Sequence, residues 1–166
     1  MPILTTKRLV LRHLTVDDAP FILELLNEPS FIQNIGDRGV HSLDDARAYL
    51  QNGPLASYER HGFGLYCVEL QASGAAIGMC GLIRRDTLPD VDVGYAFFPR
   101  YWGQGYAFEA AAAALTYGRD YLGLPRVIAI VSPGNTASIN VLQKLGLKFD
   151  RMISWSEDGT ELKVFA

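Results

Sequence analysis

The sequence is poor in cysteine and histidine, with only 2 cysteines and 3 histidines among 166 residues. Cys67 and Cys80 both lie inside apolar segments, which favours buried, reduced thiols over a disulfide or a catalytic role. None of the histidines has another histidine or a cysteine at metal-ligand spacing. We therefore expect no metal site.

Long apolar runs and an excess of positive charge are also missing. No uninterrupted apolar segment is long enough to span a bilayer. The first residues lack the basic segment followed by an apolar one that marks a secretory signal. The formal net charge of −3 argues against a nucleic-acid partner. We expect neither a nucleic-acid nor a membrane partner, and the cytoplasm as the location.

The composition that remains is that of an ordinary globular protein, with 49% hydrophobic and 20% charged residues. A chain of this length is expected to form one domain, over residues 1–166, with a substantial core. The apolar periodicity predicts strands over residues 8–14, 62–70, 75–85, 90–99, 126–131, 147–155 and 161–166.

Helices are expected between several of these strands. Thr15 and Ser42 each stand three residues before an acid, which predicts a cap at the start of a helix. The second of these helices is expected to break at Gly53-Pro54. Further helices begin near Tyr106 and surround residues 139–145, and Asp158-Gly159 predicts a hairpin turn. Because strands outnumber crossover helices, a mixed α/β (α+β) sheet fits better than a doubly wound parallel one.

The most informative segment is "RYWGQGYAFEAA", residues 100–111, where Gly103 and Gly105 stand at the mouth of an alanine-rich helix. A helix start leaves backbone N–H groups without intrahelical partners at its positive end, and glycine lets an anion approach that backbone. The arrangement suits a phosphate group. A tight connection without a ligand is equally compatible with two glycines alone. A dinucleotide fingerprint is not, since Phe108 stands at its third small position, and the lysine of a P-loop is absent.

The longer segment "DVGYAFFPRYWGQGYAFEA" resembles the acyl-coenzyme A pyrophosphate motif of the GNAT superfamily of N-acetyltransferases, with Arg100, Gly103 and Gly105 at its three fixed positions. The surrounding residues resemble the RimJ/RimL branch, whose enzymes acetylate protein N-termini and some other amines. Two more segments extend this resemblance over nearly the whole chain: "TKRLVLRHLTVDDAPFILELLNEP" near the start and "NTASINVLQKLGLKF" near the end.

The resemblance implies a central mixed, mostly antiparallel sheet that is flanked by helices and splayed between the fourth and fifth strands, here residues 90–99 and 126–131. It also implies acetyl-coenzyme A as the cofactor. Backbone amides from Trp102 to Ala107 would bind the pyrophosphate, Phe97 and Phe98 would pair through their backbone with the pantetheine arm, and Asn135 would lie near the thioester. The implied cofactor-binding residues are Phe97, Phe98, Arg100, Trp102, Gly103, Gln104, Gly105, Tyr106, Ala107, Asn135 and Ser138.

Acetyl transfer needs a neutral amine, donors for the developing oxyanion and a proton or donor for the leaving thiolate. Asp92 is the candidate base, directly or through water, because it lies where the family often carries an acid; a salt-bridged strand carboxylate is the alternative. Glu109 is interpreted as an acid that complements the helix dipole. Ser138 is the candidate acid, because Leu142 occupies the position of the family's usual tyrosine. Residues 135–138 could equally serve as a helix cap.

The acceptor is expected to be a protein N-terminal amine or a small amine, and the sequence does not separate the two. The polar segment of residues 31–41 predicts a loop, either for acceptor recognition or as a plain surface connection. A non-catalytic acyl-coenzyme A-binding sensor is the alternative function. A homodimer is compatible with the resemblance.

Overall fold

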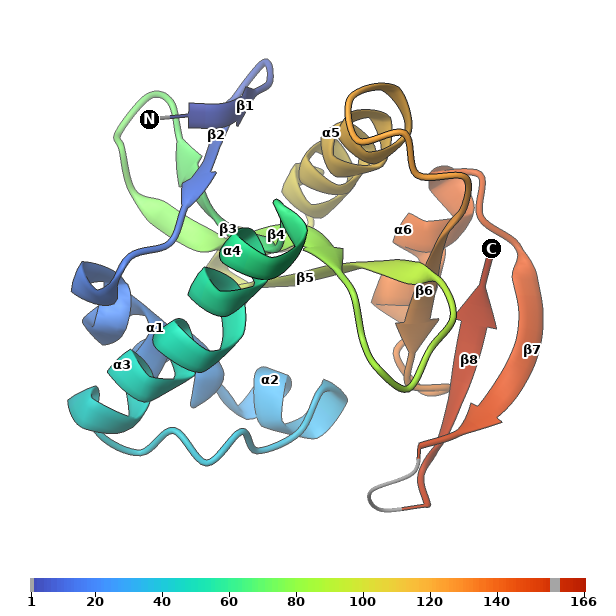
Figure 1. Ribbon diagram of the computed structural model, residues 1–166, viewed down its shortest axis with the longest axis horizontal. Helices are drawn as coiled ribbons and strands as arrows, with labels where there is room; N and C mark the ends of the chain where they lie inside the picture. The colour runs from blue at the N-terminus through green and yellow to red at the C-terminus, as the bar shows by residue number, and fades with distance from the viewer. Residues whose placement is uncertain (1, 156–158) are drawn as a thin grey trace.

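The computed structural model describes residues 2–155 and 159–166 (Figure 1). Its strands form one sheet in the order β1-β2-β3-β4-β5-β6-β8-β7. The β5–β6 pair is parallel, and the other neighbouring pairs are antiparallel. The predicted mixed, mostly antiparallel sheet is therefore confirmed.

The elements follow the predicted order with a few additions. The strands are β1 (Pro2–Thr5), β2 (Leu9–His13), β3 (Leu65–Leu70), β4 (Ala76–Ile83), β5 (Val91–Phe97), β6 (Val127–Val131), β7 (Phe149–Ser154) and β8 (Glu161–Phe165). The helices are α1 (Ala19–Leu26), α2 (Pro29–Asn34), α3 (Leu43–Leu50), α4 (Ala56–His61), α5 (Tyr106–Asp120) and α6 (Thr136–Lys144). The short edge strand β1 and the short helix α2 were not predicted. The predicted turn at Asp158-Gly159 lies partly outside the described residues.

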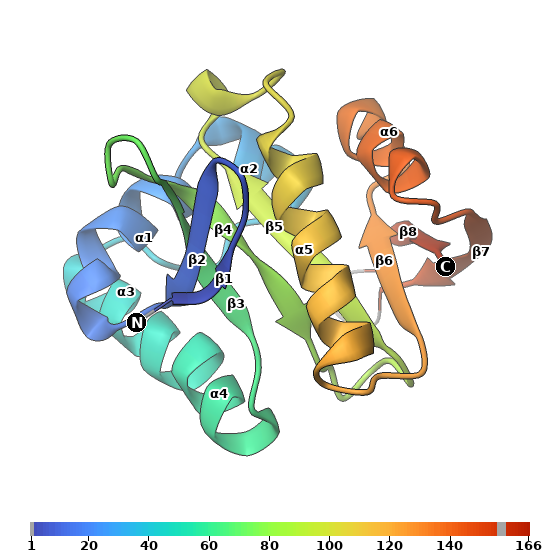
Figure 2. The same ribbon diagram turned by 90° about the horizontal axis from the view of Figure 1, so that it is seen from above.

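The sheet opens between β5 and β6, as the resemblance implied. These strands pair only at Val91 with Val127 and at Asp92 with Ile128. Beyond that point β5 continues to Phe97 with β4 as its neighbour, while β6 turns to β8. The two strands are close at one end and diverge toward the other, where the turn before α5 and the start of α6 both lie (Figure 2).

Helices cover both faces of the sheet (Figure 1). On one face, apolar residues of β5 such as Val93 pack with Ala111 of α5 and Leu142 of α6. On the other, Met79 of β4 packs with residues of α1 and α3 such as Ile22 and Leu50. The core is thus divided by the sheet into two layers, and alternate residues of β5 belong to different layers.

Both cysteines lie in this core, as expected. Cys67 and Cys80 are free thiols with no exposed surface. Burial raises the pKa of each thiol to about 12, so both stay protonated at neutral pH. They are therefore buried, reduced residues rather than nucleophiles.

The predicted helix starts are correct, but the predicted break is wrong. Thr15 and Asp18 form a reciprocal capping box, and the Ser42 hydroxyl accepts a hydrogen bond from the Asp45 N–H at 3.0 Å. At Gly53-Pro54, however, the chain continues from α3 into α4 through a π-helical segment (Gln51–Leu55). The wider π-helical turn accommodates the proline ring that would clash within an α-helix.

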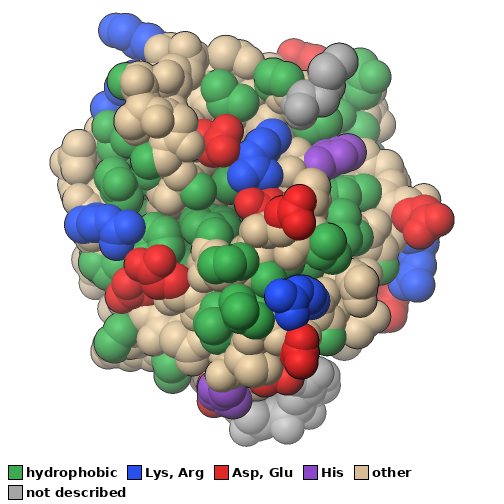
Figure 3. Space-filling view, turned by 90° about the vertical axis from the view of Figure 1, so that its left-hand side faces the viewer, with side chains coloured by type: hydrophobic (Ala, Val, Ile, Leu, Met, Phe, Trp, Pro, Cys, Tyr) green, Lys and Arg blue, Asp and Glu red, His purple; other side chains and the backbone are tan. Residues whose placement is uncertain are grey.

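The segment of residues 31–41 is only partly a loop, because α2 extends to Asn34. The Ser132 hydroxyl, just after β6, donates a hydrogen bond to the Asn34 carbonyl oxygen at 2.9 Å. The end of α2 is therefore fixed beside the open end of β6. On the molecular face seen in Figure 3, acidic and basic side chains are interspersed among apolar ones rather than gathered into areas of one charge. No helix within the described residues is long and apolar enough to cross a membrane.

Candidate active site

The turn between β5 and α5 is shaped by two glycines with left-handed backbone. After a short 3-10 helix (Pro99–Tyr101), Gly103 and Gly105 adopt φ angles of +75° and +83°, which L side chains rarely adopt. A Cβ at Gly103 would meet nothing within 4 Å, and one at Gly105 would meet only the Arg8 guanidinium, at 3.4 Å. The backbone here is thus left open to a ligand.

The backbone amides of this turn form a cradle for an anion. The N–H groups of residues 103–107 have no acceptor among the residues that the structure describes. They lie at the positive end of α5, a helix of 15 residues. The Trp102 N–H, by contrast, donates to the Pro99 carbonyl oxygen at 3.0 Å, so the predicted set of amides begins one residue later, at Gly103. Such a row of free donors fits a diphosphate.

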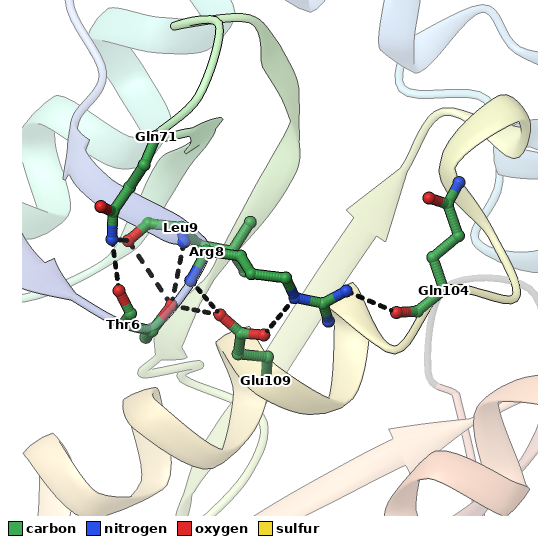
Figure 4. A network of polar contacts seen from close by, with 6 residues as sticks. All are labelled: Thr6, Arg8, Leu9, Gln71, Gln104 and Glu109. Atoms are coloured by element: carbon green, nitrogen blue, oxygen red, sulfur yellow. Dashed lines mark hydrogen bonds and ion pairs between the residues drawn. The ribbon is translucent and has the colours of Figure 1, made fainter.

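A polar network holds this turn to the β1–β2 hairpin (Figure 4). Glu109 accepts hydrogen bonds from the Thr6 hydroxyl at 2.5 Å, the Arg8 N–H at 2.9 Å and Arg8 Nε at 2.8 Å. Arg8 Nη1 also donates to the Gln104 carbonyl oxygen at 2.9 Å, and the guanidinium lies 4.3 Å from the ring centroid of Tyr106. Glu109 therefore does more than complement the helix dipole, since it anchors the arginine that fixes the turn. Thr6 and Glu109 are 103 positions apart, so no local pattern could have revealed the contact.

We expect Glu109→Gln to weaken binding of coenzyme A roughly five-fold, the equivalent of about 1 kcal/mol for a partly exposed ion pair. Burial acts to raise the pKa of Glu109, but the hydrogen bonds from Thr6 and Arg8 outweigh it and hold the pKa below its ordinary value. The carboxylate is thus charged at neutral pH, and the variant removes that charge while keeping the shape. Calorimetric titration with coenzyme A measures the effect. Asp120→Asn, at the other end of α5 in an exposed ion pair, is the control. Equal affinity in both variants would contradict the anchoring role.

Arg100 lies beside the turn but its charge is directed elsewhere. Its Nη1 is 3.8 Å from Glu24 Oε1 of α1, and its guanidinium stacks over Phe98 at 4.4 Å from the ring centroid. Its carbonyl oxygen accepts a hydrogen bond from Gln104 Nε2 at 3.4 Å. Arg100 therefore supports the turn in this structure and has a partly exposed guanidinium to offer a phosphate.

The edge of β5 that faces the opening offers different backbone groups from those predicted. The Phe98 N–H donates to the Ile77 carbonyl oxygen at 3.1 Å, and its carbonyl oxygen accepts from the Tyr101 N–H at 2.9 Å. Phe98 is buried and has no free backbone group, so it does not fit the predicted pantetheine contact. Because backbone direction alternates along a strand, Tyr95 and Phe97 face the opening instead. The Phe97 carbonyl oxygen already accepts a hydrogen bond from Trp102 Nε1 at 3.0 Å.

Ser138 lies across the opening from β5, in the first turn of α6. Its N–H donates to Asn135 Oδ1 at 3.2 Å, so these two residues do form a helix cap. Its hydroxyl oxygen is 2.7 Å from the Tyr95 hydroxyl. Burial raises the pKa of Tyr95 to about 12, opposed by the hydrogen bond with Ser138. The structure therefore brings Ser138 to the opening, together with a tyrosine that the sequence analysis did not select for catalysis.

Asp92 lies at the last residue pair before β5 and β6 separate. It is the one charged side chain that is buried within the described residues, with 1% of its surface exposed. Arg85 Nε lies 2.9 Å from Oδ1, and Nη2 lies 3.4 Å from Oδ2. Burial raises the pKa of Asp92, and the charge and hydrogen bonds of Arg85 act in the opposite direction. The geometry is the salt-bridged strand carboxylate that we named as the alternative to a base.

The Asp92 side chain and Ser138 lie on opposite faces of β5. Asp92 and Tyr95 point to opposite faces of the strand, and Ser138 contacts Tyr95. The Asp92 face is the one covered by α1, α2 and α3. Arg85 lies 5.5 Å from the ring of Trp155. Burial raises the pKa of Tyr49 in α3, and the charges of Arg38 and Arg85 act more weakly to lower it.

Among the described residues, no cluster of three or more histidine, cysteine or acidic side chains could hold a metal ion.

Comparison with known proteins agrees with this geometry. Residues 8–148 match the family model described as the acetyltransferase (GNAT) domain. The uncharacterized N-acetyltransferase YnaD of Bacillus subtilis is 30% identical over 145 residues, which are 87% of this chain and 82% of that protein. The crystal structure of an acetyltransferase from Agrobacterium tumefaciens is 26% identical, with a TM-score of 0.83, and covers 100% of this chain and 95% of its own.

The fold is also similar to that of RimL, the ribosomal L7/L12 alpha-N-protein acetyltransferase, in its complex with coenzyme A. That structure has a TM-score of 0.84 and 18% identity, and the match covers 99% of this chain and 96% of RimL. At this identity the likeness concerns the fold.

Proposed function

The chain belongs to the acetyltransferase (GNAT) domain family, and we propose that it is an N-acetyltransferase of the RimJ/RimL-like branch that takes its acetyl group from acetyl-coenzyme A. In this proposal a primary amine attacks the thioester directly. The observation that carries it is the row of free amides at residues 103–107, beside an opened strand edge. The fold likeness to RimL bound to coenzyme A supports the same cofactor.

The residues at the opening would divide the binding of coenzyme A between them. The amides from Gly103 to Ala107 would hold the diphosphate at the positive end of α5, and Arg8 would keep that turn in place. The backbone groups of Tyr95 and Phe97 would pair with the amides of the pantetheine arm, as an added strand pairs with a sheet edge. When bound, acetyl-coenzyme A supplies an acyl group activated as a thioester.

Two side chains would serve the chemistry from opposite faces of β5. Ser138 would direct its hydroxyl at the leaving sulfur, since it faces the opening from α6. Asp92 would accept the proton of the attacking amine through an ordered water, since Arg85 occupies both of its carboxylate oxygens. A backbone N–H on the free edge of β5 would stabilise the oxyanion.

The amine would enter on the Asp92 face. There the end of α2 is tied to the end of β6 by Ser132, which leaves residues 35–41 beside the open end of the sheet. A protein N-terminal amine and a small primary amine both fit this description, and the RimJ/RimL-like assignment favours the former.

A direct test is thiol release from acetyl-coenzyme A in the presence of a panel of amines: N-terminal peptides, amino acids, polyamines and aminoglycosides. We expect release to depend on the acceptor and to be matched by the mass of an acetylated product. Binding of coenzyme A with no turnover on any acceptor would favour the alternative of a non-catalytic sensor. No binding at all would refute both.

A further inference from the structure

The hydroxyl groups of Tyr95 and Ser138 meet across the opening of the sheet. Tyr95 comes from β5, and Ser138 comes from α6, which follows β6 in the chain. Their oxygen atoms are 2.7 Å apart, and the Ser138 backbone is fixed by the Asn135 cap. Because β5 and β6 have no paired residues beyond Asp92 and Ile128, this contact is a polar link between the two sides where the cofactor would enter.

The direction of this hydrogen bond decides what Ser138 can do. A phenol is a stronger acid than an aliphatic alcohol, and the Tyr95 hydroxyl lies 2.7 Å from the Ser138 hydroxyl oxygen but 3.4 Å from the Ser138 carbonyl oxygen. Tyr95 is therefore the preferred donor and the nearer oxygen, that of the Ser138 hydroxyl, the acceptor. The Ser138 hydroxyl hydrogen is then free to point into the opening. Since burial raises the pKa of Tyr95 to about 12, the phenol stays protonated at neutral pH and keeps a hydrogen to donate.

Resting on the function proposed above, we infer that Tyr95 is a positioning residue for acetyl transfer: its phenol turns the Ser138 hydroxyl hydrogen toward the leaving sulfur of coenzyme A. Ser138 is the group that touches sulfur, and it stabilises the developing thiolate by a hydrogen bond. No proton needs to leave Tyr95. A hydrogen bond received from the phenol also polarises the Ser138 hydroxyl and strengthens its donation. The position of the family's usual tyrosine in α6 is occupied by Leu142, which is buried and carries no hydroxyl. In this chain the phenol comes from β5 instead.

We expect Tyr95→Phe to lower the single-turnover rate about ten-fold, less than the 10²–10³-fold typical for loss of a direct donor. The affinity for coenzyme A, measured by calorimetry, should stay within about two-fold, the equivalent of about 0.4 kcal/mol. Tyr121→Phe is the matched control, because Tyr121 is 76% exposed beyond the end of α5. A Tyr95→Phe variant with the wild-type rate would overturn the inference.

A double variant separates positioning from a structural role. If Tyr95 acts only through Ser138, adding Tyr95→Phe to Ser138→Ala should cause no further loss of rate. Additive losses would show that Tyr95 acts by itself or merely supports the fold. Wild-type protein without any acetyl transfer would instead refute the proposed function, so the two failures can be told apart.

A fluorinated tyrosine at position 95 keeps the ring in place and tests the donor direction even if Tyr95→Phe does not fold. Fluorination acidifies the phenol and brings its ionisation into an accessible pH range. Above that pKa the phenolate accepts the Ser138 hydrogen and turns it away from sulfur, so the rate should fall as pH rises. Without cofactor, Ser138→Ala should raise the same phenol's pKa in a spectroscopic titration, because Ser138 acts to lower it. A rate that ignores the ionisation, or a pKa that ignores Ser138, would contradict the inference.

Discussion

Replacing Gly105 by valine is expected to weaken the binding of coenzyme A by about 10²–10⁴-fold. The glycine has a φ of +83°, where a β-branched residue is strained, so the turn must rearrange. A rearranged turn loses at least two of the amide contacts with the diphosphate, each worth about 1.5–3 kcal/mol as a hydrogen bond to a charged group. The sum, about 3–6 kcal/mol, gives the stated range of affinity. Calorimetric titration of the variant with coenzyme A measures it.

The control must carry the same backbone strain without touching the cradle. Gly74, in the turn between β3 and β4, has a φ of +74° and open space around its Cβ position. Gly74→Val should therefore lose a similar amount of folding stability, about 1–3 kcal/mol, and bind coenzyme A normally. If Gly105→Val also bound normally, the diphosphate would have to lie elsewhere and the assignment of the cradle would be wrong.

Local patterns predicted those parts of the molecule that depend on near neighbours in the sequence. The capping residues Thr15 and Ser42 act within three positions, and the glycine turn before α5 shapes its own backbone. The opening of the sheet came from the family resemblance, since residues 126–131 give no local sign of their pairing. The strand β1 was not predicted because an edge strand of 4 residues is too short to show a clear apolar alternation.

The contacts that complete the site depend on the fold and could not be read locally. Glu109 meets residues near the start of the chain, and Ser138 meets a strand residue 43 positions before it. One pair did leave a trace in the sequence. In the β4–β5 hairpin Ile83 pairs with Asp92, and the Arg85 side chain lies beside that carboxylate. A register for the hairpin would have predicted the ion pair.

That ion pair makes Asp92→Asn the second informative change, with an expected loss of turnover of about 10²-fold or more if Asp92 is the base. A base works when deprotonated, so wild-type activity should fall as pH falls through the pKa of Asp92. Burial raises this pKa above the ordinary aspartate value, so the acidic limb should lie at higher pH than it would for an exposed carboxylate. In Asp92→Asn this limb should disappear from the pH profile of kcat/KM. Asp44→Asn, in an exposed ion pair with Arg47, is the control.

Arg85→Gln distinguishes a base from a purely structural ion pair. Arg85 acts to lower the pKa of Asp92, so its removal should raise that pKa and move the acidic limb to higher pH while activity above the limb persists. A structural pair predicts instead that both variants lose stability alike and keep their rate per folded molecule. The same pKa shift makes the stability of the protein depend on pH. A raised pKa means that the contribution of Asp92 is greatest below the ordinary aspartate pKa and is lost as pH rises through the folded value. The free energy of unfolding of Asp92→Asn, measured in urea, should therefore depend less on pH in that interval than that of the wild type. An unchanged acidic limb in the pH profile of this variant's activity would clear Asp92 of the base role.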